Sequence, residues 1–270
     1  PLPPLPPLPP LPPPTLFNHH QRRRRRHCQR PFQAMEKAVV EPYENLAGLM
    51  RTAGYHVPQV RNFKLARSIF HMLNSLAVVG GGEMLLDMDQ LRSLALVCAV
   101  GAWTMELLKQ RSDAFKRIMF QVLGAISRDG EQHNVNSATW FMSAMLVISW
   151  CNPKIACCIG TIALGVGDPA AAFVGSKFGS IKLYGKKTLE GTGAFAIVTC
   201  LATVAYLSLF YETSATDMAL ISVTGAITGA IAELYCTFVD DNLFVPVATG
   251  AAVTAVMGQF DIVPKSAAWR

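Results

Sequence analysis

Two short runs of the sequence carry the residue types that phosphate chemistry requires. The first is Gly167-Asp168-Pro169, in which Asp168 lies late in an apolar stretch. An ionisable side chain inside such a stretch is costly, so Asp168 is a functional candidate by default. A structural interpretation stays open, because an Asp-Pro pair also caps or kinks helices.

The second run is a basic, glycine-spaced segment between residues 175 and 191. Glycines let a ligand approach the backbone closely, and lysines supply cations for phosphate oxygens. Beside Asp168 this composition suits a nucleoside triphosphate, whereas by itself it is also typical of a solvated basic loop. The predicted nucleotide-binding residues of this segment are Gly175, Lys177, Gly179, Lys186, Lys187, Thr188, Glu190 and Gly191.

A carboxylate pair, Asp240-Asp241, precedes Asn242 at the start of the last apolar stretch. Mg²⁺ prefers oxygen ligands and bridges nucleotide phosphates, so we predict Asp168, Asp240 and Asp241 as metal ligands, with Asn242 beside them. Asp168, Lys187 and Asp241 are the predicted catalytic residues. Capping of the last helix by Asp241 and Asn242 is an alternative interpretation, and the two roles are compatible.

Three further polar residues, Lys64, Arg67 and His71, have the spacing of one helix face at the start of the first apolar stretch. Basic side chains at such a position ordinarily extend toward the membrane surface. The sharper hypothesis is a phosphate clamp, with Arg67 as a nucleotide-binding residue.

The basic segment is not a P-loop. Five residues separate Gly179 from Gly185 where that motif requires four, and Lys187 follows Lys186 where Ser or Thr is required. The sequence also lacks the His-Arg-Asp and Asp-Phe-Gly motifs of protein kinases.

Zinc and nucleic-acid sites are also not predicted. Most of the seven cysteines fall in or beside apolar stretches, and Cys157 and Cys158 are adjacent rather than spaced for a metal. The +6 net charge is mostly a property of the N-terminal region, where residues 22–26 are all Arg. No module that reads bases follows this basic run, so no nucleic-acid partner is expected.

The composition favours a membrane protein, because 51% of the residues are hydrophobic and only 16% are charged. We predict an all-α fold, a polytopic transmembrane bundle of about seven spans, with a buried helical core of a soluble protein as the alternative. The apolar stretches are residues 68–82, 93–108, 135–151, 155–174, 193–210, 218–232 and 243–258.

The distribution of Lys and Arg predicts the orientation of these spans. Basic residues gather before the first stretch, between the second and third, and between the fourth and fifth, whereas residues 191–260 contain none. The positive-inside rule therefore predicts a cytosolic N-terminus and a lumenal C-terminus. This topology places all the predicted site residues on the cytosolic face.

Three segments are predicted along the chain. Residues 1–33 are a Pro- and Arg-rich low-complexity tail that we expect to be disordered, residues 34–61 a connector, and residues 62–260 the membrane-embedded catalytic domain. Because the chain begins at Pro1 without Met, we expect a fragment or a translated flank at this end.

Taken together, these motifs resemble those of the membrane family of CTP-dependent lipid kinases. The family comprises CTP-dependent diacylglycerol kinase, dolichol kinase and phytol kinase, and is related to the phosphatidate cytidylyltransferases. Arg67 with His71 is similar to its basic-plus-His element, although Ser68 stands where the family usually has Lys. The resemblance covers residues 62–258, and its carriers are Gly167-Asp168-Pro169-Ala170-Ala171, Gly175 with Gly179, the run from Lys186 to Thr192, and Asp240-Asp241-Asn242 followed by Pro246.

The resemblance implies CTP as the phosphoryl donor, Mg²⁺ or another divalent cation as the cofactor, and a membrane lipid alcohol as the acceptor. It ranks diacylglycerol first, giving phosphatidate, then dolichol and phytol, in the endoplasmic reticulum with the active site facing the cytosol. The cytidylyltransferases are an alternative that is less similar, because their C-terminal signature has no counterpart after Phe260. A membrane transporter or an inactive family member is the non-enzymatic alternative, and the sequence leaves the oligomeric state open.

Overall fold

The computed structural model describes residues 65–123, 134–236, 240–260 and 262–264. The chain separates into two units, Pro1–Tyr43 and Glu44–Arg270, and all the described residues lie in the second. The predicted disordered tail and connector, residues 1–33 and 34–61, fall outside them and stay predictions.

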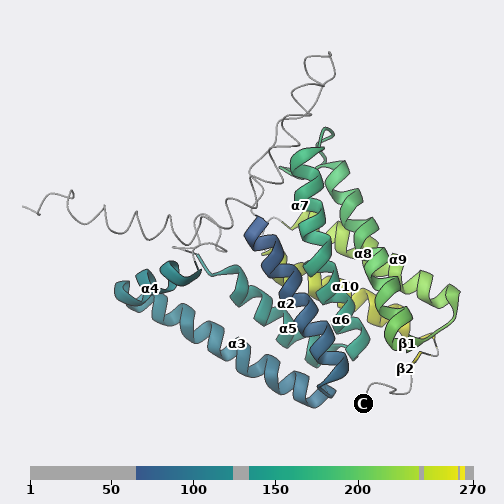
Figure 1. Ribbon diagram of the computed structural model, residues 1–270, viewed down its shortest axis with the longest axis horizontal. Helices are drawn as coiled ribbons and strands as arrows, with labels where there is room; N and C mark the ends of the chain where they lie inside the picture. Colours follow the sequence, from purple (N-terminus) through teal and green to yellow (C-terminus); the bar gives the residue numbers. More distant parts are fainter. Residues whose placement is uncertain (1–64, 124–133, 237–239, 261, 265–270) are drawn as a thin grey trace, which may run out of the picture. The chain divides into compact units, whose positions relative to one another are not determined.

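The described part of the chain is mostly helical (Figure 1), which confirms the predicted helical class. Each of the seven predicted apolar stretches coincides with a helix or with a run of consecutive helices. The elements are α2 (Leu65–Met84), α3 (Met88–Arg111), α4 (Asp113–Leu123), α5 (Ser137–Cys151), α6 (Lys154–Ile162), the π-helix η1 (Ala163–Gly167), α7 (Asp168–Lys177), α8 (Leu189–Phe210), β1 (Tyr211–Glu212), α9 (Ala215–Tyr235), α10 (Asp241–Met257) and β2 (Val263–Pro264).

Two features were not predicted. Helix α4 is a short amphipathic helix, with Met119 buried and Ile118 exposed. Polar and charged residues interrupt its apolar residues in the sequence, so it was not recognised as an apolar stretch. The strands β1 and β2 pair antiparallel, with Tyr211 opposite Pro264. Both features are too short for composition alone to reveal.

Polar side chains cap the helices and extend them beyond the apolar stretches. Asp87 forms a capping box with Gln90 at the start of α3, accepting from the Gln90 N–H at 2.8 Å. Asn136 caps α5 and Ser214 caps α9 in the same way, by accepting a backbone N–H of the first turn. These caps account for the starts of α3 and α9 several residues before their apolar stretches, whereas α5 begins two residues inside the predicted stretch 135–151.

Four helical segments of the described chain are long and apolar enough to cross a membrane: Met88–Arg111, Lys154–Lys177, Leu189–Phe210 and Ala215–Tyr235. Helices Ser137–Cys151 and Asp241–Met257 are apolar but shorter. The finding supports a membrane-spanning helical protein, and the count of seven spans stays a prediction.

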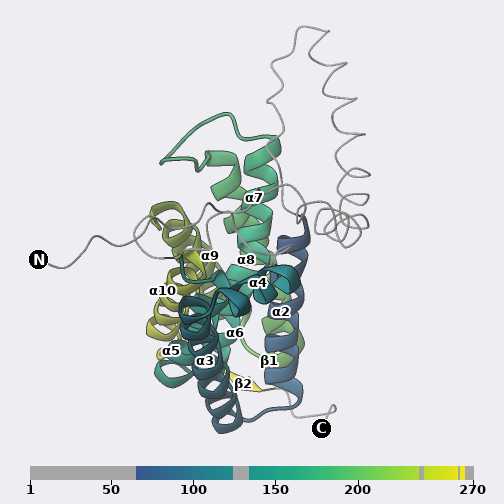
Figure 2. The ribbon, with the colours of Figure 1, turned by 90° about the vertical axis from the view of Figure 1, so that its left-hand side faces the viewer.

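The segment α6-η1-α7 lies at the centre of the described helices (Figures 1 and 2), packed by α2, α8 and α10. Small residues allow this packing, as is usual between helices in lipid. A Cβ at Gly160 would lie 2.6 Å from the carbonyl oxygen of Pro246, and one at Gly167 would lie 2.9 Å from the ring of Phe195. These close contacts with the neighbouring helices hold η1 and the start of α7 in a fixed position.

Candidate functional site

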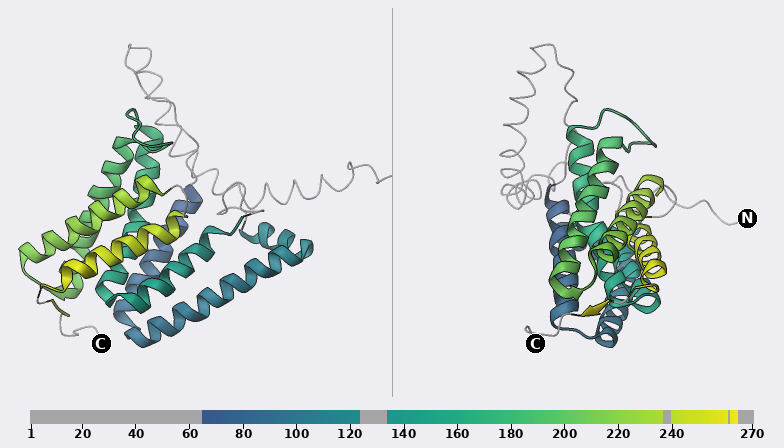
Figure 3. Two further views of the ribbon diagram at one scale, coloured as in Figure 1. Left: turned by 180° about the vertical axis from the view of Figure 1, so that it is seen from behind. Right: turned by 90° about the vertical axis from the view of Figure 1, so that its right-hand side faces the viewer.

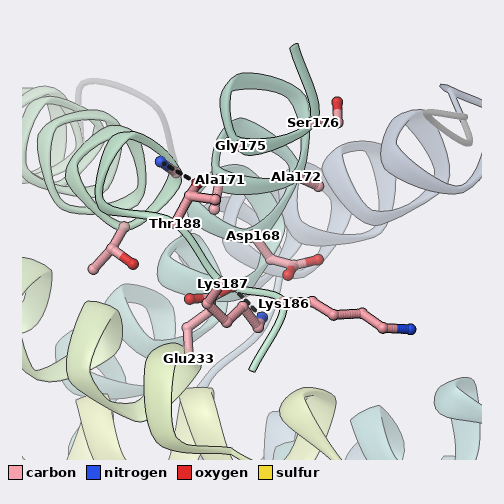
Figure 4. A pocket seen from close by; sticks show the side chains of 11 residues that line it. Asp168, Ala171, Ala172, Gly175, Ser176, Lys186, Lys187, Thr188 and Glu233 are labelled. Carbon is pink, nitrogen blue, oxygen red and sulfur yellow. Dashed lines mark hydrogen bonds and ion pairs between the residues drawn. The ribbon is translucent and has the colours of Figure 1, made fainter. Parts of the chain in front are cut away.

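A cavity opens where α7, the start of α8 and the last turn of α9 meet (Figure 4). Its volume is about 160 Å³, below the roughly 300–1,000 Å³ of pockets that enclose a whole small ligand, so it suits part of a nucleotide such as its phosphates. The lining residues are Asp168, Ala171, Ala172, Gly175, Ser176, Lys186, Lys187, Thr188, Gly191, Thr192 and Glu233.

Asp168 enters this cavity from the first turn of α7, directly after the π-helix η1. Its backbone is helical, with φ −61° and ψ −47°, so α6, η1 and α7 continue into one another through the Asp-Pro pair. No side-chain hydrogen bond caps α7, so the capping interpretation of Asp168 is wrong. Short π-helical turns of this kind occur frequently at functional sites.

The lysine loop, residues 178–188, joins α7 to α8 and projects beyond their ends (Figure 3). Gly185 turns it with a φ of +56°, a left-handed conformation that glycine adopts without strain. The Leu183 N–H donates to the Lys187 carbonyl at 3.0 Å, and the Lys187 N–H donates to the Tyr184 carbonyl at 2.9 Å. This tight turn directs Lys187 back toward the cavity.

Glu190 braces the same loop from the first turn of α8. Its carboxylate accepts the Ser180 N–H at 3.0 Å and the Ile181 N–H at 3.2 Å, and it also accepts the Ser180 hydroxyl. Glu190 does not line the cavity. The structure therefore places this predicted nucleotide-binding residue where it fixes the loop that carries the lysines.

Lys187 forms an ion pair with Glu233, which lies in the last turn of α9. The Glu233 side chain is only 4% exposed, and its Oε2 is buried without a hydrogen-bond partner. Burial by itself lowers the pKa of Lys187, but the negative charges of Glu233, Asp168 and Asp241 outweigh it and raise this pKa above its ordinary value. Lys187 therefore stays positively charged among three carboxylates.

Sequence reasoning did not assign Glu233 to the site. One signal was present: an acidic residue in the last turn of an otherwise apolar helix opposes the helix dipole, so its position calls for another reason. No motif adjoins Glu233, and its partner Lys187 lies 46 positions earlier. Only the fold shows that the two meet.

The predicted glycines pack chiefly against the protein itself. Thr188 caps α8 by accepting the Gly191 N–H at 3.2 Å, and a Cβ at Gly175 would lie 3.0 Å from its hydroxyl oxygen. At Gly179 a Cβ would lie 2.4 Å from the Gly175 carbonyl oxygen. Gly175, Thr188 and Gly191 still line the cavity, whereas Gly179 does not.

At the start of α10, the cap is Asp240 rather than Asp241 or Asn242, because its carboxylate accepts the Asn242 N–H at 3.0 Å. The buried Asn242 amide donates to Asp240 at 2.5 Å and to Asp241 at 2.9 Å. Asn242 therefore holds the two carboxylates in place. The predicted capping by Asp241 and Asn242 is therefore wrong, and capping by Asp240 is compatible with metal binding.

Two other predicted residues, Lys177 and His71, do not line the cavity. The Lys177 side chain is buried, with its ammonium 4.9 Å from the centre of the Phe173 ring. His71 is half-buried in α2, and Arg67 lies in the first turn of that helix. Lys64 falls outside the described residues.

The residues present are compatible with a divalent cation. Asp240 and Asp241 supply carboxylate oxygens, and the Oδ1 of Asn242 beside them is buried without a hydrogen-bond partner. No group of three or more His, Cys, Asp or Glu side chains within the described ranges encloses a metal ion by itself. Asp168, Asp240 and Asp241 therefore do not form such a group, and Asp240, Asp241 and Asn242 do not line the cavity. A Mg²⁺ ion takes one or two carboxylates and completes its shell with waters and substrate phosphates, so its binding here stays a prediction.

The fold and the site together define a helical protein of the membrane-spanning class with a lysine-carboxylate cavity at its helix ends. Comparison with curated proteins confirms the predicted resemblance to the CTP-dependent lipid kinases. The chain is 26% identical over 175 residues to CTP-dependent diacylglycerol kinase 1 of Saccharomyces cerevisiae, covering 58% of this chain and 60% of that protein. It is 26% identical over 171 residues to the protein of the same name in Schizosaccharomyces pombe, covering 58% of this chain and 77% of that protein.

The chain thus spans 60% of the length of the S. cerevisiae protein. No family model matches the chain. No solved structure matches it either.

Proposed function

We propose that this protein transfers the γ-phosphoryl group of CTP to the hydroxyl of a membrane lipid, with diacylglycerol as the acceptor and phosphatidate as the product. The observation that carries the proposal is the cavity in which Asp168, Lys187 and Glu233 meet at the ends of apolar helices. The names of the two similar proteins supply the nucleotide and the lipid.

The lysines bind the triphosphate in this mechanism. Lys186 and Lys187 line the cavity from one turn, and Glu190 fixes that turn through the Ser180 and Ile181 amides. Phosphoryl transfer depends mainly on positioning and on stabilising charge, so two cations carried by one turn are what the reaction needs. The cavity takes the phosphates, and the cytidine extends beyond it.

Asp168, Asp240 and Asp241 are the residues that hold Mg²⁺ in this proposal. The ion would neutralise negative charge on the triphosphate. Asn242 supports the pair Asp240-Asp241 through its amide, as described above. One of the site carboxylates accepts the proton of the lipid hydroxyl.

The location of the site explains how a lipid reaches it. Ile231 and Tyr235, in the last two turns of α9, are exposed large side chains on the same helix end as Glu233. We propose seven spans with this end at the cytosolic surface of the endoplasmic reticulum, so that a lipid hydroxyl approaches from the bilayer. A cysteine introduced by Lys182→Cys, at an exposed position in the lysine loop, should react with an impermeant thiol reagent from the cytosolic side only.

The activity is tested with the full chain purified and reconstituted in lipid vesicles. CTP or ATP labelled on the γ-phosphate is offered with diacylglycerol, dolichol or phytol, and in a separate arm CTP labelled on the α-phosphate is offered with phosphatidate. Labelled phosphatidate from γ-labelled CTP and diacylglycerol is the expected product. Label entering lipid only from the α-phosphate assigns the protein to the cytidylyltransferases, and no labelled lipid in any arm leaves the transporter or an inactive relative.

A further inference from the structure

We infer that Glu233 is a positioning residue that holds the Lys187 ammonium against α9 and thereby keeps it off the carboxylates of Asp168 and Asp241. This inference rests on the proposed function, because that function assigns the two aspartates to the divalent cation. It gives a role to a residue that no sequence motif marks.

The ion pair between Lys187 and Glu233 has one fixed and one adjustable member. The Glu233 side chain is 4% exposed and lies in the last turn of a long helix, whereas the Lys187 side chain is 34% exposed and lies in the lysine loop. Water is largely excluded around the carboxylate, which strengthens the attraction. The position of the ammonium therefore follows that of Glu233.

Glu233 has little other reason to be charged and buried. An anion at a helix C-terminus opposes the helix dipole, and a buried charge is costly without a partner. Its Oε1 is paired with Lys187, and its Oε2 has no hydrogen-bond partner among the described residues. Holding the Lys187 ammonium in position accounts for both the charge and the burial of the Glu233 carboxylate.

Two cations compete for the same oxygens at this site. Asp168 and Lys187 line the same cavity (Figure 4), and the charges of Asp168 and Asp241 also act on the Lys187 ammonium. An ammonium has three donors and binds whichever carboxylates it reaches. Without the charge of Glu233, Lys187 would settle on the aspartates and obstruct the metal.

The test measures Mn²⁺ binding to the purified full chain without nucleotide, by electron paramagnetic resonance. Glu233→Gln should weaken Mn²⁺ binding about 5- to 30-fold, the range expected for coupled charges. Lys187→Met combined with Glu233→Gln should restore binding to the wild-type value or better, because the competing cation is gone. A double variant as weak as Glu233→Gln alone overturns the inference.

Glu106→Gln is a matched control. Glu106 is also buried and ion-paired with a lysine, Lys109, at the end of α3, but it does not line the cavity. Its substitution should leave Mn²⁺ binding unchanged, and an equal loss would show that any broken buried pair disturbs the site. Should Glu233→Gln fail to fold, Glu233→Asp withdraws the charge by one methylene and should weaken Mn²⁺ binding in the same direction, by less.

The outcomes separate this inference from the proposed function. If the wild-type protein phosphorylates no lipid, the proposed function fails, while the Mn²⁺ measurements still decide the role of Glu233. If the wild-type protein is an active kinase and Glu233→Gln lowers kcat with unchanged Mn²⁺ binding, Glu233 acts on the acceptor instead, and the positioning role is overturned.

Discussion

The backbone of Gly191, in the first turn of α8, lies directly against that of Gly175 in α7. A Cβ at Gly191 would lie 3.2 Å from the Gly175 Cα and 3.0 Å from the Ala171 carbonyl oxygen, both of them backbone atoms that cannot easily move. The two glycines therefore set the distance between the helices that carry Asp168 and the lysine loop. The geometry of the cavity wall depends on their lacking side chains.

Gly191→Ala should destabilise the protein by about 1–3 kcal/mol, because the added methyl forces α7 and α8 apart. Gly193→Ala is the control two residues along the same helix, where a Cβ would meet nothing within 4 Å. That change should stabilise the protein by about 0.5–1 kcal/mol, since alanine is the better helix former. Thermal unfolding in detergent measures both, and equal shifts for the two variants would contradict the packing argument.

Asp168→Asn should lower kcat at least about 100-fold while the protein still folds and enters the membrane, because the amide keeps the shape of the side chain but not its charge. Asp89→Asn is the control, since Asp89 is exposed beside Arg92 at the opposite end of the helices. Phosphoryl transfer to diacylglycerol at saturating CTP is the measurement. Wild-type turnover in Asp168→Asn would make Asp168 a structural residue.

Lys187 should remain protonated throughout the physiological range. A lysine whose pKa is raised in the folded state keeps its positive charge at all lower pH values and loses it only as the pH rises through that raised pKa. The affinity for CTP can be measured by thermal protection from about pH 7 to about pH 9. It should depend on pH in the same way in the wild type and in Lys187→Arg, because the arginine side chain does not titrate in this range. Affinity falling with pH in the wild type alone would show a lowered pKa instead.

The sequence predicted the helical class and located the cavity, and it did so for a physical reason. Apolar stretches must form helices in a membrane, and a carboxylate such as Asp168 inside one is too costly to be incidental. Basic residues in the loop to α8 fitted an anion, and Lys186 and Lys187 indeed line the cavity.

What the sequence could not show were contacts between distant segments. Glu190 looked like a ligand residue, yet it accepts loop amides, and Gly179 meets Thr188 rather than open space. Glu233 carried no motif, because its role arises only when α9 returns to the lysine loop. Such pairings depend on tertiary packing, which local residue types do not encode.

Another largely buried carboxylate, that of Glu83 at the end of α2, should control stability rather than activity. Its Oε1 accepts the hydroxyl of Tyr206 at 2.5 Å and that of Tyr211 at 2.8 Å, and its Oε2 lies 3.7 Å from the ammonium of Lys154. Tyr206 and Tyr211 lie at the C-terminal end of α8, whereas the cavity lies at its N-terminal end. The cluster therefore joins α2, α6, α8 and β1 far from the proposed chemistry.

Glu83→Leu should lower the free energy of unfolding by about 2–4 kcal/mol, because two buried hydroxyls lose their acceptor, each at about 1–3 kcal/mol, with partial relaxation. Adding Tyr206→Phe and Tyr211→Phe removes the stranded hydroxyls and should recover part of that loss. Thermal unfolding of the wild type, Glu83→Leu and the triple variant measures the effect, with KM for CTP as the check that the cavity is intact. A triple variant no more stable than Glu83→Leu would show that the tyrosine hydroxyls do not depend on Glu83, and a raised KM would show that this end of α8 is coupled to the site.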